Sequence, residues 1–143
     1  MHLALKPLLP KLLGEPQIGF VAGRQIDENI LCVAELARFS EARGRGGLFV
    51  MLDNAKAFDR VQPTFVQKVL EAFGFPAEFR KLIAMMYTNI TSVLKVNGHR
   101  GEAFAVSNGV RQGCCLSPSI YVLAHEVFMR MIREDTRLRG IKI

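Results

Sequence analysis

The chain has 143 residues, half of them apolar, with a formal net charge of +6 and a pI near 9.6. This length holds one hydrophobic core, and the apolar content excludes a disordered tail. The positive charge favours a polyanionic partner such as a nucleic acid. Three cysteines, two of them adjacent at Cys114 and Cys115, make neither a disulfide framework nor a CxxC metal pair, which indicates a reducing compartment.

The N-terminal stretch MHLALKPLLPKLL is the longest apolar run, and Pro7, Pro10 and two lysines interrupt it. It is shorter than the roughly 20 residues that span a bilayer. It also lacks the small-residue cleavage site of a secretory signal. We therefore expect an intracellular protein, in the nucleus or the cytoplasm, with no membrane partner. The sequence does not indicate an oligomeric state.

The pattern next predicts a helix from Ile26 to about Arg43, because apolar residues recur at helical spacing and Gly44 supplies a stop. RGRGG at 43–47 is the one plausible flexible join. The apolar run LFVML at 48–52 predicts a buried strand that ends on Asp53.

Two helices are predicted after this strand. The first begins at Pro63, which suits the first turn of a helix, and runs to Phe73 with Gly74 as its stop. The second runs from Ala77 to Thr88. Both predictions depend on apolar residues that recur on one helical face.

The second half of the chain begins with a hairpin signal, Asn97-Gly98 between two strand-like runs. Gly109 and Gly113 then mark a loop in which the backbone bends or approaches another molecule closely. A long helix is predicted at 117–134, and the closing RGIKI at 139–143 predicts one more strand. Strands and helices that alternate irregularly around a hairpin favour an α+β fold over a doubly wound one.

Asp53 and Asp59 are two acids six positions apart. The carboxylates of a two-metal site converge on ions about 3.5 to 4 Å apart. Six residues of strand span about 20 Å, and six residues of helix turn through roughly 600°. Regular structure therefore does not bring the two acids together, although a turn at 54–57 would relax this limit. The pattern favours Asp59 as a turn residue before the helix at Pro63.

Three ordered blocks, QIGFVAGRQIDENI, LDNAKAFDRV and GVRQGCCLSP, resemble the central blocks of reverse transcriptases of non-LTR retrotransposons. The resemblance covers about Leu5 to Ile143. Group II intron and other prokaryotic reverse transcriptases share looser versions of these blocks. The resemblance implies an RNA-directed DNA polymerase whose partners are an RNA template, a DNA primer and dNTP. It also implies part of a right-hand polymerase palm, with an antiparallel sheet packed on helices and a truncated fingers region.

By this resemblance Asp53 is the catalytic metal ligand, and the backbone carbonyl of Asn54 is a second contact. Oxygen ligands suit Mg²⁺, for which Mn²⁺ is a possible substitute. The resemblance places Ala55, Lys56, Ala57 and Phe58 beneath the incoming nucleotide, with the Phe58 ring under its sugar. Ordinary core packing is the alternative reading of Phe58.

Gln112 and Gly113 match the block that lines the nucleotide and template side of such a site. Arg111 and Arg24 are candidate nucleic-acid contacts, and solvent exposure or a structural turn accounts for them equally well. Two departures from the family pattern, Ala22 and Cys115, replace a proline that is common in this family.

The resemblance divides residues 1–143 into fingers and palm-side helices at 1–47 and palm at 48–143. The family's aromatic-x-Asp-Asp hairpin, its upstream basic hairpin and its thumb have no counterpart here. We therefore expect residues 1–143 alone to be catalytically incomplete. Two alternatives remain: a group II intron-like reverse transcriptase, and a decayed relic or nucleic-acid-binding module without chemistry.

Overall fold

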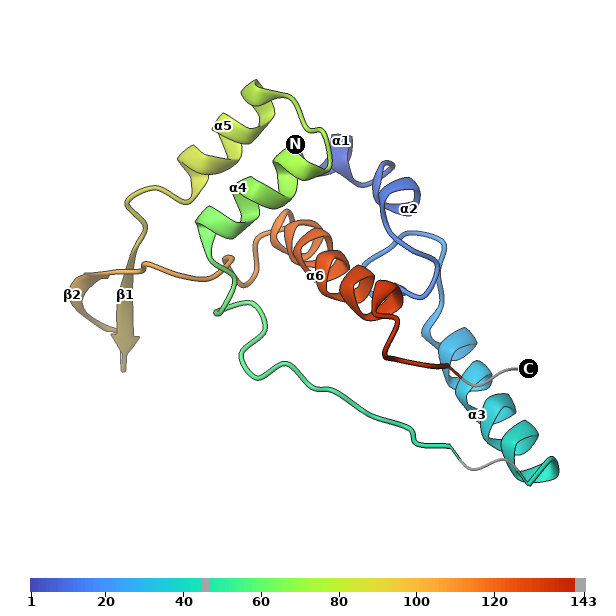
Figure 1. Ribbon diagram of the computed structural model, residues 1–143. Helices are drawn as coiled ribbons and strands as arrows, with labels where there is room; N and C mark the ends of the chain where they lie inside the picture. The colour runs from blue at the N-terminus through green and yellow to red at the C-terminus, as the bar shows by residue number, and fades with distance from the viewer. Residues whose placement is uncertain (45–46, 141–143) are drawn as a thin grey trace.

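The computed structural model describes residues 1–44 and 47–140. Along these ranges the order is α1 (His2–Leu5), α2 (Leu9–Leu12), α3 (Ile26–Ala42), α4 (Pro63–Ala72), α5 (Ala77–Met86), β1 (Thr91–Val96), β2 (His99–Ala105) and α6 (Ser117–Glu134) (Figure 1). Helices and one antiparallel two-stranded sheet share the chain, so the predicted α+β class is confirmed. No helix in the described part of the chain combines the length and the apolar character that a membrane span requires.

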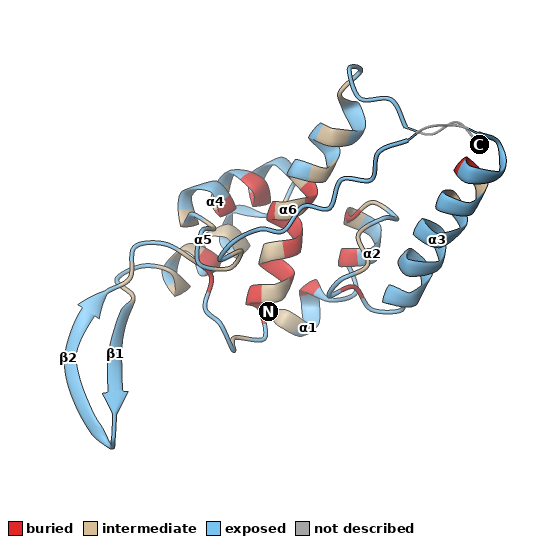
Figure 2. Cartoon of the chain, turned by 90° about the horizontal axis from the view of Figure 1, so that it is seen from below, coloured by how far each residue is buried: buried red, intermediate tan, exposed pale blue. Residues whose placement is uncertain are grey.

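The hydrophobic core lies around α6. This helix buries Ile120, Val122 and Leu123, and it packs against α4 and α2. Figure 2 shows the buried residues concentrated on α6 and on the faces of α4 and α2 that meet it. Apolar residues at helical spacing produce such a face, and Pro118 lies in the first turn of α6, where a missing N–H costs no hydrogen bond.

Helix α4 begins and ends at the proline and glycine signals that the sequence predicted. Pro63 is its first residue. At its other end Gly74 has φ +75°, a left-handed conformation that favours glycine. The N–H of Gly74 donates to the carbonyl of Glu71, and the N–H of Phe75 donates to the carbonyl of Leu70. This pair of bonds is a Schellman motif, which satisfies carbonyls that the end of a helix leaves free.

The predicted hairpin at Asn97-Gly98 is confirmed. Both turn residues have positive φ, +50° and +85°, which matches the twist of a tight hairpin. The expectation that the sheet packs on helices is wrong for this hairpin, because every residue of both strands is exposed. Figures 1 and 2 both show β1 and β2 projecting away from the helices.

The buried strand predicted at 48–52 is not formed. This segment is extended but belongs to no sheet, and its side chains are exposed, with Met51 at 95%. A strand needs a neighbour for its backbone groups, and none of the described residues pairs with it. Of the strand predicted at 139–143, Arg139 and Gly140 are irregular, and 141–143 lie outside the described residues, as do 45 and 46 in the predicted flexible join.

The helix predicted from Ile26 is confirmed, and it ends at Ala42, one residue earlier than expected. Its apolar positions do not pack into the core, since Ile26 is 71% exposed and Ile30 is also exposed. Figure 1 shows α3 extending away from the α4–α6 core. Helical spacing therefore predicted the helix correctly, but it did not show which partner covers its apolar face.

Candidate active site

The chain turns tightly directly after Asp53. The N–H groups of Asp59 and Arg60 both donate to the carbonyl of Lys56, at 3.0 and 3.1 Å. Lys56 itself has φ +54°, a left-handed conformation that non-glycine residues seldom adopt. Regular structure would keep Asp53 and Asp59 apart, and a turn between them relaxes this limit. The prediction that Asp59 is a turn residue is confirmed.

Backbone hydrogen bonds join this turn to the loop around Gly109. The N–H of Val110 donates to the carbonyl of Phe58 at 2.8 Å, and the N–H of Gly109 donates to the carbonyl of Val61 at 2.9 Å. The Gln112 side-chain amide donates to Asp59 Oδ1 at 3.1 Å. Two blocks about 50 residues apart in the sequence thus lie side by side, and Gln112 contacts Asp59 rather than Asp53.

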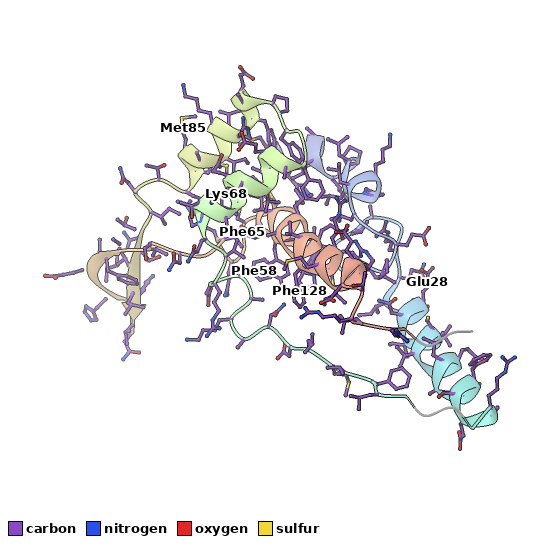
Figure 3. All side chains as sticks on the ribbon, viewed as in Figure 1. Glu28, Phe58, Phe65, Lys68, Met85 and Phe128 are labelled. Carbon is purple, nitrogen blue, oxygen red and sulfur yellow. The ribbon has the colours of Figure 1, made fainter. Side chains whose placement is uncertain are left out.

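A cavity of about 640 Å³ opens between this turn and α6. Asp53 and Asn54 line one side of it, and Tyr121, His125 and Phe128 of α6 line the other. Phe65, at the start of α4, also lines the cavity, and Figure 3 shows Phe58 between Phe65 and Phe128.

Aromatic contacts fix the position of Phe58. Its ring stacks on Tyr121 with centroids 4.9 Å apart and planes at 16°, and the ring of Phe20 meets it edge-on at 6.2 Å. The Asn54 side-chain amide donates to the Tyr121 hydroxyl at 3.3 Å. Tyr121 therefore contacts both ends of the turn that follows Asp53.

Sequence reasoning missed Tyr121, His125 and Phe128. They fall at i, i+4 and i+7 along α6, so they share one face of the helix. Tyr121 stacks on His125 at 5.7 Å, and His125 contacts Phe128 at 5.8 Å. The helical spacing of aromatic residues was the available signal, but it does not show that this face lines a cavity.

Asp53 is exposed at the edge of the cavity, and its carboxylate has no hydrogen-bond or ion-pair partner in the described part of the chain. Its oxygen atoms are ligands of the kind that Mg²⁺ prefers. Among the described residues, however, no group of three acidic, histidine or cysteine side chains surrounds a common point. The donors present fit a divalent ion in kind, and they supply only part of the shell that two ions need.

The two candidate arginine contacts differ in their surroundings. Arg24 donates to four backbone carbonyls, those of Gly14 at 2.6 Å, Gln17 at 2.5 Å, and Pro10 and Leu13 at 3.3 Å each. This arrangement joins α2 to the loop at 13–17, which supports the structural reading of Arg24.

Arg111, by contrast, is exposed beside the predicted nucleotide block. Burial raises the pKa of the nearby Cys114 thiol, but bonds from the Leu116 and Ser117 backbone and the charge of Arg111 outweigh it and hold this pKa below its usual value.

A family model described as reverse transcriptase (RNA-dependent DNA polymerase) matches residues 1–143. The chain belongs to the reverse transcriptase family. It is 34% identical over 141 residues to an uncharacterized 149 kDa protein of transposon TX1 from Xenopus laevis, covering 99% of this chain and 11% of that protein.

Two further relatives are polyproteins of retrotransposable elements. The chain is 28% identical over 125 residues to a retrovirus-related Pol polyprotein of element R2 from Nasonia vitripennis, covering 87% of this chain and 12% of that protein. It is also 28% identical over 119 residues to the retrovirus-related Pol polyprotein of element R2DM from Drosophila melanogaster, covering 83% of this chain and 11% of that protein. The prediction of a non-LTR retrotransposon reverse transcriptase domain is confirmed, and the chain spans about a tenth of each of these relatives.

Proposed function

We propose that a protein containing this chain synthesises DNA on an RNA template, and that Asp53 is its metal ligand within this chain. The observation that carries the proposal is the unpaired Asp53 carboxylate at the edge of the cavity. The turn that follows it is joined to the Gly109 loop, as two parts of one site would be. Family membership supplies the reaction class.

The reaction transfers a nucleotide from dNTP to the 3′-hydroxyl of a DNA primer. Asp53 and the backbone carbonyl of Asn54 would hold Mg²⁺, or Mn²⁺ in its place. Bound Mg²⁺ supplies positive charge that stabilises the attacking and leaving oxygens of the transferred phosphate. The proposal requires further carboxylates from outside the described residues, because Asp53 alone does not complete the shell of two ions.

The turn at 55–58 is the proposed floor of the nucleotide site. The backbone of Ala55, Lys56 and Ala57 would contact the triphosphate, since amides of a tight turn make a concave donor surface for anions. Phe58 would lie beneath the sugar, and its stacking on Tyr121 would hold the ring in place.

On the opposite side, Gln112 and Gly113 would line the nucleotide and template, and Arg111 would contact a phosphate. Both side chains are exposed, and Gln112 donates one hydrogen bond to Asp59. We assign Arg24 to loop structure because its guanidinium already has four backbone acceptors. We keep the division into fingers and palm-side helices at 1–47 and palm at 48–143 as part of this proposal.

The experiment is primer extension on an RNA template by the longer protein that contains this chain. We expect Asp53→Asn to lower the rate by at least about a hundredfold, on the scale at which loss of one electrostatic group lowers kcat, while duplex binding stays intact. Asp59→Asn is the matched control and should cost much less, because an amide oxygen still accepts from Gln112. An Asp53→Asn protein that extends primers like its parent would show that this position is acidic for structural reasons alone.

The second candidate is a nucleic-acid-binding module without chemistry, which the incomplete set of metal ligands favours. Residues 1–143 by themselves should bind duplex and extend no primer under either proposal. Only the longer protein separates the two candidates: extension there supports the polymerase, and binding without extension supports the module.

A further inference from the structure

The β1–β2 hairpin places two cations opposite each other. Lys95 and Arg100 are cross-strand partners in register, so their side chains leave the same face of the ribbon. The Cβ atoms of such partners lie about 5 Å apart, and like charges at this separation destabilise a β-ribbon. The fold therefore keeps a pair of residues that weakens the hairpin carrying them.

No acidic group relieves this repulsion within the described residues. Neither Lys95 nor Arg100 forms an ion pair or a side-chain hydrogen bond there. Glu102 is the one acidic residue of the hairpin. It lies where the register shifts, since Leu94 alone faces Gly101 and Glu102, and this bulge separates it from the Lys95–Arg100 rung.

The face that carries the two cations is open. All residues of β1 and β2 are exposed, and the hairpin stands clear of the helices in both views (Figures 1 and 2). An anion placed between the two side chains would meet both charges at once. Arginine suits phosphate through paired N–H donors, and lysine acts as a point charge beside it.

We propose that the Lys95–Arg100 pair of the hairpin binds the phosphate backbone of a nucleic acid. The occupant follows from charge complementarity: two unpaired cations on a chain of net charge +6 attract a polyanion. The choice of nucleic acid rests on the proposed function, because a template–primer duplex is the polyanion that a polymerase holds. The hairpin is then a contact arm outside the cavity at Asp53.

The test is a titration of a labelled RNA–DNA duplex with residues 1–143, followed by fluorescence anisotropy at several salt concentrations. We expect the double variant Lys95→Gln with Arg100→Gln to bind at least about tenfold more weakly at 0.1 M salt. The slope of log affinity against log salt should fall by about 2, since each lost phosphate contact removes about 0.9.

The matched control is the double variant Lys68→Gln with Lys81→Gln. It removes the same charge from exposed positions on α4 and α5 that have no ion pair in the described part of the chain (Lys68 is labelled in Figure 3). Its affinity should stay within about twofold of the parent, because it loses only long-range attraction.

A third variant separates binding from folding. Lys95→Glu replaces the repulsive pair by an attractive Glu–Arg pair, so it should slow amide exchange in the hairpin while it weakens duplex binding. A mere folding defect does not produce both effects, because it would speed exchange.

Three results would overturn the proposal. The first is no duplex binding by the parent at low salt, and the second is equal affinity and salt slope for the hairpin variant and the Lys68/Lys81 control. The third is equal binding of polyglutamate and duplex, which would assign the pair to an acidic protein surface. The proposed polymerase fails on a different result, the absence of primer extension by the longer protein while duplex binding is intact.

Discussion

Tyr121 shows how one residue connects the turn after Asp53 to the core. Its ring supports Phe58 from one side, and its hydroxyl accepts a hydrogen bond from Asn54. Stacked aromatic pairs contribute about 0.5 to 1.5 kcal/mol beyond the area they bury. The two readings of Phe58, a ring beneath the sugar and a packed residue, are therefore compatible, because packing on Tyr121 is what fixes the ring.

Gly109 allows the two sequence blocks to meet. Its φ is +97°, and a Cβ atom there would lie 3.0 Å from the Asp59 Cα atom, which belongs to the backbone and has no rotamer with which to move away. We expect Gly109→Ala to lower the free energy of unfolding by about 2 kcal/mol, from the strained φ and the clash together. Urea unfolding followed by circular dichroism measures this loss.

Gly113→Ala is the control for that measurement. Gly113 has a similar φ, +80°, but a Cβ atom there meets nothing within 4 Å. Gly113→Ala should lower the free energy of unfolding by only about 1 kcal/mol, because it adds backbone strain but no clash. Equal losses for the two variants would mean that the contact between Gly109 and Asp59 contributes nothing to stability.

At the scale of elements, the buried carboxylate of Glu126 connects α6 to neighbouring helices through two arginines. Glu126 has no exposed side-chain surface, and it accepts from Arg130 at 3.0 Å and from Arg133 at 2.5 Å. Arg130 also donates to the Leu12 carbonyl and lies over the Phe73 ring. One acid therefore organises contacts to both α2 and the end of α4.

This network predicts acid sensitivity. Burial raises the pKa of Glu126, but the hydrogen bonds from Arg130 and Arg133 outweigh it and hold the pKa below the usual 4.5. A carboxylate whose pKa is lower in the folded state stabilises the fold fully above its unfolded pKa, and this stability is lost as pH falls through the folded pKa. We expect the free energy of unfolding to drop below about pH 4.5 for this reason.

The variant Glu126→Gln should remove part of that pH dependence and cost about 3 kcal/mol at neutral pH, because it leaves two arginine charges beside a buried neutral amide in place of a carboxylate. Urea unfolding at pH 7 and below pH 4.5 measures both effects. Glu71→Gln is the control: Glu71 pairs with Arg80 at 2.6 Å but is largely exposed, so its loss should cost less than about 1 kcal/mol. Equal losses at Glu71 and Glu126 would contradict the role of burial.

For the whole molecule, the exposed segment 48–52 is the main departure from a packed domain. Its backbone groups have no partner in the described part of the chain. We expect its amides to exchange with solvent much faster than those of α6 in residues 1–143, measured by hydrogen exchange with mass spectrometry. In the longer protein they should be protected, because an apolar extended run is stable only beside another strand. Slow exchange at 48–52 in the short chain at every protein concentration would contradict this prediction.

The sequence by itself determined the local elements and the family. Proline and glycine signals marked α4 and the hairpin correctly, because capping and turn conformations depend on a few adjacent residues. Helical spacing likewise predicted α3 and α6. Three ordered blocks identified a reverse transcriptase, since block order and spacing along the chain are themselves sequence properties.

Only the tertiary structure decided which surfaces meet. The apolar run at 48–52 and the apolar residues Ile26 and Ile30 of α3 are exposed, although their composition is that of buried segments. Burial requires a partner surface, and a sequence window contains no information about whether that partner is present. The same limit explains why the sequence did not predict the contact between Gln112 and Asp59, and why the part that Tyr121 plays was missed. Long-range contacts depend on how the whole chain folds back on itself, because residues some 50 positions apart interact only after the elements between them have packed.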